Sequence, residues 1–165
     1  MKKTALCLAA LLLLALSLSS CMKMPVSYEP AYGTDGISSV KIYYIESENG
    51  FYSYEEFKPE EQAAASAEIP ADRYEELFTD LEALGFWKLI PLLPVPMDPN
   101  FYICDYVLVI TYEDGRYECI DPDGVQCWSD NTESSKGSHL SCPDEEWDSF
   151  ISKYAPDLGT TAPTE

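Results

Sequence analysis

The single histidine of the chain, His139, is the side chain best suited to acid–base catalysis at neutral pH. It lies in a polar stretch rich in serines, so a serine–histidine–acid triad is one arrangement to consider. The candidate nucleophiles are Ser129, Ser134 and Ser135. None of them lies in a Gly-x-Ser-x-Gly sequence, the pattern of a nucleophile elbow. We therefore expect a solvent-exposed loop histidine and no catalytic residue.

Carboxylates are the most abundant reactive groups, with 29 aspartates and glutamates against 10 lysines and arginines. A glycosidase needs two carboxylates about 5 to 10 Å apart in a cleft, and no pair stands out among so many. Glu55, Glu56, Glu60 and Glu61 are expected to form a solvated face.

The sequence Asp121-Pro122-Asp123-Gly124 resembles the first half of a calcium-binding loop. Pro122 and Trp128 do not suit such a loop, which also needs an acidic ligand at its twelfth position. The sequence therefore predicts a turn here, because Asp, Pro and Gly favour turn conformations. We expect no metal site and no cofactor.

The first 20 residues have the composition of a secretory signal. Lys2 and Lys3 provide a cationic start, and the run from Leu6 to Leu18 is apolar. This run is short for a membrane span, which needs roughly 20 residues. Small residues follow it, as before a cleavage site.

The motif Leu18-Ser19-Ser20-Cys21 resembles the lipobox of bacterial lipoproteins, an aliphatic residue followed by two small residues and a cysteine. The resemblance implies a diacylglyceryl group on the Cys21 thiol, cleavage after Ser20, and anchoring by acyl chains such as palmitate. Each buried methylene contributes about 0.8 kcal/mol to such anchoring. The expected location is the cell membrane or outer membrane, facing outside the cytoplasm. The alternatives are an ordinary cleaved signal or an uncleaved anchor.

Outside this motif the chain resembles other small bacterial lipoproteins only in a general way. That general likeness transfers no functional residue. There is no Gly-rich phosphate loop and no dinucleotide-binding fingerprint in the sequence.

An exported domain with an even number of cysteines is expected to form disulfides. The candidates are Cys104, Cys119, Cys127 and Cys142. Zinc sites pair cysteines two to four residues apart, whereas these neighbours are separated by 14, 7 and 14 residues, so zinc is not expected.

The expected pairing depends on a hairpin with Asp114-Gly115 as its two-residue loop. In that register Cys119 lies opposite Ile110, roughly 20 Å from Cys104 at about 3.3 Å per residue, which excludes a Cys104–Cys119 bridge. If the strand continues past residue 121, Cys104 comes close to Cys127. We therefore favour Cys104–Cys127 with Cys119–Cys142. The alternative is Cys104–Cys142 with Cys119–Cys127.

The elements that must position these residues are predicted to form one α+β domain over residues 39–155. Residues 21–38 contain several prolines and glycines and are predicted to form a flexible tether. Residues 156–165 are predicted to be a disordered tail. The predicted domain is an antiparallel sheet in β-β-α-β-β-α order with helices packed on one face.

A first hairpin is predicted around Asn49-Gly50, between β-prone runs at 40–47 and 51–57. It would place Tyr43, Tyr52 and Tyr54 on one face, which is a candidate binding face for a glycan or a protein. The alternative is that these tyrosines only pair with each other within the sheet.

Later in the chain, apolar residues recur at helical spacing after Pro70, and Gly85 marks the end of that helix. The strongest strand pattern covers residues 102–112, and a closing helix begins after Pro143.

The net charge of the chain limits the kinds of partner that it can bind. The net charge is -19, and loss of a leader containing Lys2 and Lys3 leaves the mature chain near -21. Such a chain repels phosphate backbones, so no nucleic-acid partner is expected.

Together these features predict a membrane-anchored, non-catalytic binding or interaction domain outside the cytoplasm. Its partners would be membrane lipid, through acylated Cys21, and an extracellular protein or glycan. The alternatives are a small cell-envelope hydrolase that uses the loop around His139, and a structural or inhibitor-like envelope protein.

Overall fold

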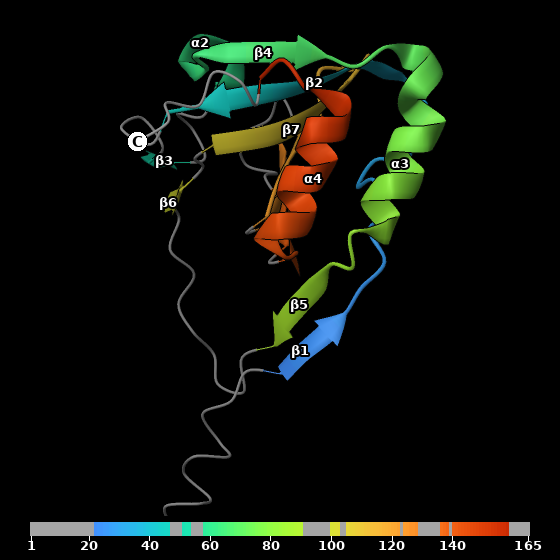
Figure 1. The fold of residues 1–165 in the computed structure, drawn as a ribbon, viewed down its shortest axis with the longest axis vertical. Helices are drawn as coiled ribbons and strands as arrows, with labels where there is room; N and C mark the ends of the chain where they lie inside the picture. Colours follow the sequence, from blue (N-terminus) through green and yellow to red (C-terminus); the bar gives the residue numbers. More distant parts are fainter. Residues whose placement is uncertain are drawn as a thin grey trace, which may run out of the picture.

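A six-stranded antiparallel sheet forms the centre of the fold in the computed structural model (Figure 1). The structure describes residues 22–46, 51–53, 58–90, 100–102, 105–122, 124–128, 136–138 and 140–158. The strand order is β10-β9-β8-β7-β2-β4, and each neighbouring pair is antiparallel. The strands are β2 (Ile37–Ile45), β4 (Ala65–Glu68), β7 (Asp105–Tyr112), β8 (Tyr117–Asp121), β9 (Gly124–Trp128) and β10 (Lys136–Ser138).

Two smaller sheets accompany the central one. Strands β1 (Met22–Pro25), β5 (Trp87–Ile90) and β11 (Leu140–Ser141) pair in the order β1-β5-β11. Strand β3 (Phe51–Ser53) pairs with β6 (Asn100–Tyr102).

Two helices, α3 (Tyr74–Ala83) and α4 (Asp144–Tyr154), pack on one face of the central sheet, and a 3-10 turn, η2 (Ala71–Arg73), precedes α3. Both helices were predicted from their apolar spacing, and the structure confirms them. Gly85 has a φ of 66°, a left-handed conformation that costs glycine little and suits the residue after a helix. A third helix, α2 (Pro59–Gln62), is a single turn on the other side of the sheet. Strand β4 runs between α2 and α3 (Figure 1).

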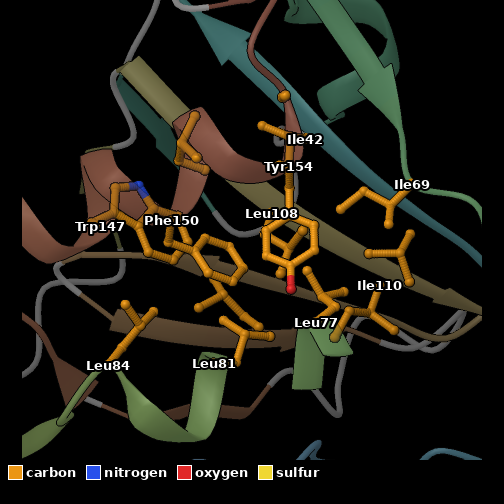
Figure 2. Close-up of a cluster of buried hydrophobic side chains, with 14 of the residues drawn as sticks. Ile42, Ile69, Leu77, Leu81, Leu84, Leu108, Ile110, Trp147, Phe150 and Tyr154 are labelled. Carbon is orange, nitrogen blue, oxygen red and sulfur yellow. The ribbon is translucent and has the colours of Figure 1, made fainter. Parts of the chain in front are cut away.

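The main core lies between α3, α4 and the first face of the sheet. Figure 2 shows Leu77 and Leu81 of α3 pointing toward the aromatic side chains of α4, with Leu108 and Ile110 of the sheet close by. The α4 contribution is a row of rings, in which Trp147 and Phe150 stack with centroids 5.5 Å apart. The sheet contributes Val40, Ile42, Leu108, Ile110 and Ile120, each with 0 % of its surface exposed. Full burial of one such side chain contributes about 1.5–3 kcal/mol, so this face is the main source of stability.

The second face of the sheet carries a smaller cluster of buried side chains. Its members are Tyr43, Ile45, Val107, Val109 and Cys119. They alternate along their strands with the residues of the main core, as the two-residue period of a strand requires. The α+β class predicted from sequence is therefore confirmed. Helices α3 and α4 cover one face, and the short helix α2 lies over part of the other.

The predicted hairpin around Asn49-Gly50 is not formed, since β2 pairs with β4 and β7 and β3 pairs with β6. Residues 41–44 are bonded to neighbours on both edges, so no free edge of β2 remains there for β3. The segment that joins two adjacent β-prone runs does not determine their pairing when each run has a better partner farther along the chain.

The second hairpin forms, but its register differs by one residue from the prediction. Gly115 has a φ of 87°, and the Tyr112 amide donates to the Arg116 carbonyl at 2.9 Å. The loop therefore has three residues and ends in a left-handed glycine, the second common type of hairpin connection. Cys119 consequently lies opposite Val109, whereas Ile110 had been expected.

The favoured disulfide between Cys119 and Cys142 is wrong. Cys119 belongs to the cluster on the second face, and Cys142 belongs to the main core on the first face, so the sheet lies between them. No disulfide bond joins two cysteines of the described part of the chain. The reasoning for Cys104–Cys127 also fails, because β8 turns at Asp121 into β9, which lies on the side of β8 away from β7. Cys104 and the side chain of Cys127 lie outside the described residues.

Much of the predicted tether is part of the folded domain. Residues 22–25 form β1, and Tyr28 is 4 % exposed in the main core. The prolines and glycines of this segment shape turns against the domain, and its tyrosines supply apolar surface that packs there. At the other end Leu158 is also buried, so the packed region extends beyond residue 155.

Candidate binding cleft

A cleft of about 320 Å³ lies between helix α2 and the second face of the sheet. Its floor is made by three neighbouring strands, with Tyr43 from β2, Val109 and Thr111 from β7, and Tyr117 from β8. Its wall consists of the consecutive residues 58–61. The volume falls within the range of about 300–1,000 Å³ that is usual for sites of small ligands.

Strand register brings the floor residues together. Thr111 lies directly opposite Tyr117, and Val109 lies opposite Lys41, two residues before Tyr43. Directly paired residues share a face, so these side chains must all point to the second face. The same alternation sends their sequence neighbours into the main core.

The wall is a helix of one turn whose first residue is Pro59. Proline suits this position because it has no N–H to satisfy and its φ is already helical. Pro59 is buried, and the helix ends where the Ala63 amide donates to the Pro59 carbonyl at 3.1 Å. Glu60 and Glu61 lie in the first turn, where the helix dipole favours negative charge.

Polar contacts connect the wall to the floor. The Tyr43 hydroxyl donates to Glu60 Oε1 at 3.5 Å, and Lys41 Nζ lies 3.7 Å from the same oxygen. Lys58 Nζ pairs with Glu61 Oε1 at 3.2 Å. Each of these pairs is long or exposed, so each contributes little to stability.

The two tyrosines are hydrogen-bond donors at neutral pH. Burial, together with the nearby charge of Glu60, raises the pKa of Tyr43 to about 12. Burial also raises the pKa of Tyr117. Neither hydroxyl can therefore act as a base near pH 7. The described lining residues offer apolar surface, aromatic rings and hydrogen-bonding groups, all of which can hold a small ligand.

Of the three tyrosines of the predicted binding face, Tyr43 does not lie on an exposed strip. Tyr43 is 5 % exposed and forms part of the cleft floor. Tyr52 lies on β3, which does not pair with β2, and Tyr54 lies outside the described residues. Of the carboxylates expected to be solvated, Glu60 and Glu61 are exposed but also line the cleft.

Other predicted sites divide between the described and undescribed parts of the chain. Cys21, His139 and the three candidate serines lie outside the described residues. The turn at Asp121 is confirmed, because Asp121 Oδ1 accepts a hydrogen bond from the Gly124 amide at 2.8 Å in the β8–β9 connection. The described residues include no group of three or more side chains that could hold a metal ion.

One buried carboxylate, that of Glu118, was not predicted from the sequence. Glu118 has 0 % of its surface exposed and lies on the first face, within the main core layer. It accepts hydrogen bonds from the Tyr28 hydroxyl and the Ala31 amide, both at 3.0 Å. In β8, Cys119 faces one side of the sheet, whereas Glu118 and Ile120 face the other. This two-residue alternation among apolar residues is the sequence signal that could have identified Glu118 as buried.

No protein-family model, no curated protein and no solved structure matches this chain. In the described part of the chain, no helix is both long enough and apolar enough to cross a membrane.

Proposed function

We propose that this protein is a lipid-anchored binding domain outside the cytoplasm, held by acylated Cys21, and that the cleft beside α2 is its ligand site. The observation that carries the binding role is the cleft itself, whose described residues form an apolar and aromatic floor and a charged wall. The lipobox-like motif at residues 18–21 supports the anchor.

The ligand that fits this lining is a small molecule with an aromatic or apolar body and at least one polar group. The floor offers the faces of apolar and aromatic side chains, which favour such a body. The wall offers both a cation, Lys58, and carboxylates, Glu60 and Glu61. A site of this kind binds through a few placed polar groups on a largely apolar surface.

Binding can be tested by titrating the folded protein with indole and tyramine as aromatic probes and following amide chemical shifts. Shifts are expected to concentrate on residues 58–61 and on the floor strands. In the variant Thr111→Phe the larger side chain should fill the cleft and abolish the shifts. The control variant Ser152→Phe, on the exposed side of α4, should leave the shifts unchanged. Binding that survives Thr111→Phe, or shifts that spread without a centre, would argue against this site.

The anchor can be tested by mass spectrometry of the peptide that contains residue 21. The expected result is a new amino terminus at Cys21 that carries a diacylglyceryl group, and Cys21→Ser should release the protein from the membrane fraction. An intact Met1, or an unmodified thiol at residue 21, would contradict the anchor.

A further inference from the structure

Strands β1 and β5, the first two strands of the three-stranded sheet β1-β5-β11, form an arm that begins one residue after the proposed lipid attachment site. Met22 pairs with Ile90 and Pro25 pairs with Trp87, so the start of β1 lies beside the end of β5. Figure 1 shows this arm at the far end of the molecule from β2 and β4. Because no spacer separates Cys21 from β1, an acyl group on residue 21 would bring the arm to the bilayer with it.

The arm differs in composition from the rest of this acidic chain. Neither β1, which reads Met-Lys-Met-Pro, nor β5, which reads Trp-Lys-Leu-Ile, contains an acidic residue. After removal of Lys2 and Lys3, eight of the 10 lysines and arginines remain. Two of those eight, Lys23 and Lys88, lie in these two short strands.

The described side chains of the arm are those typical of a membrane interface. Met24 is the one large hydrophobic residue that is exposed among the described residues, at 44 %. Lys23 Nζ lies 4.2 Å from the centre of the half-buried Trp87 ring. Tryptophan is enriched at the level of lipid headgroups, and lysine there combines an apolar stem with a charge that attracts anionic lipids.

We infer that the β1–β5 arm is a membrane-docking surface that lies against the anionic headgroups of the bilayer and orients the domain. This inference rests on the proposed lipid anchor. The acyl chains supply attachment, and the arm supplies a second contact that a single flexible tether would lack. The net charge of the chain opposes approach to an anionic surface, so an acid-free arm beside the anchor determines which side of the domain meets the lipid.

The test uses the purified lipoprotein in vesicles of phosphatidylglycerol and phosphatidylcholine that contain brominated lipid, which quenches nearby tryptophan fluorescence. Mass spectrometry first establishes the modification of residue 21 in the same sample. We expect strong quenching in the unaltered protein and loss of most of it in Trp87→Phe. Lys23→Glu should lower the ratio of docked to undocked arms at least about fivefold, because loss of one cation near an anionic surface costs roughly 1 kcal/mol and the new carboxylate is repelled as well.

Lys153→Glu is the matched control, because it makes the same charge reversal at an exposed lysine of α4, outside both the arm and the cleft. Quenching should remain at the level of the unaltered protein in this variant. If residue 21 is lipidated but Trp87→Phe leaves quenching unchanged, or if both lysine variants behave alike, the arm does not dock and the anchor stands alone. If residue 21 is unmodified, both the proposed lipid anchor and the proposed docking of the arm are contradicted.

Discussion

The carboxylate of Glu118 accepts a hydrogen bond from the Tyr28 hydroxyl at 3.0 Å, across 90 residues of sequence and within the buried core. The Ala31 amide donates to the second carboxylate oxygen at 3.0 Å. These two contacts connect the segment after the β1–β5 arm to the centre of the sheet. Burial raises the pKa of Glu118 to about 7, and the hydrogen bonds from Ala31 and Tyr28 oppose that rise only in part.

Folding stability should therefore fall as the pH rises from about 5 to 8. The folded-state pKa of Glu118, about 7, lies above the ordinary value of 4.5, so the folded protein holds this proton more tightly than the unfolded chain. The stabilisation is complete below pH 4.5 and is lost as the pH rises through 7, by at most about 3 kcal/mol at about 1.4 kcal/mol per pKa unit. Urea denaturation at a series of pH values measures this loss.

Glu118→Gln should remove most of that pH dependence. The glutamine amide can donate to the Tyr28 oxygen while its carbonyl accepts from Ala31, as neutral Glu118 would. Salt bridges lower the pKa values of Glu76 and Asp80, so these groups affect stability only at more acidic pH. Replacing the exposed Glu113→Gln is the control and should leave the slope intact. A slope that persists in Glu118→Gln would assign the titration to another group.

Tyr28→Phe should destabilise the protein, and more strongly at pH 8 than at pH 5. Loss of a hydrogen bond to a buried group costs about 1–3 kcal/mol, with the larger cost when the abandoned partner is charged. Glu118 is mostly neutral at pH 5 and mostly ionised at pH 8, given its raised pKa. Tyr106→Phe is the matched control, because the Tyr106 hydroxyl donates to the neutral Leu158 carbonyl at 3.2 Å. The cost of Tyr106→Phe should be similar at both pH values, measured by urea midpoints, and equal pH trends in the two variants would refute this account.

The elements with strong periodicity were predictable from sequence. Helix α3 repeats apolar residues at three- and four-residue spacing and ends at Gly85, and α4 follows Pro143 with acidic residues in its first turn. Strand β7 is a continuous β-prone run. Each of these elements is determined by its own residues and their burial, so local pattern was sufficient.

Strand pairing was less predictable because it depends on competition between distant segments. The sequence around Asn49-Gly50 favours a local hairpin, yet β2 lies between β4 and β7. The second hairpin has the expected turn residues, but one additional loop residue shifts its register. The inferred disulfide geometry failed for different reasons, because β8 turns at Asp121 into β9 and because Cys119 and Cys142 lie on opposite faces of the sheet.

Only one residue of the candidate cleft could be predicted from the sequence. Tyr43 was identified as a binding residue from its type and its strand, although it lies in a cleft floor and not on an exposed strip. Thr111 and Tyr117 join it through the β7–β8 pairing, and the wall comes from a one-turn helix in a segment that had no clear pattern. Such a site is formed by tertiary contacts, which cannot be predicted from the spacing of residues within one segment.

Peptide mapping of the non-reduced protein should find no Cys119–Cys142 bridge. The two residues lie in clusters on opposite faces of the central sheet, and a disulfide requires their α-carbons within about 7 Å. Cys142→Ser should therefore leave the state of Cys119 unchanged in the same map. Recovery of a Cys119–Cys142 peptide from folded protein would mean that the two cysteines lie on the same face of the sheet.

Leu81→Ala should destabilise the fold by about 2–5 kcal/mol, because it opens a cavity in a well-packed core. Leu81 has 0 % of its surface exposed and lies in α3 among the core side chains that face α4 (Figure 2). Its neighbour Glu82 is exposed on the same helix, so Glu82→Ala is the matched control and should change stability by less than about 0.5 kcal/mol. Urea midpoints for the two variants measure the difference. Equal midpoints would show that α3 does not pack on the sheet through Leu81, and the helix would then have to present another face to the core.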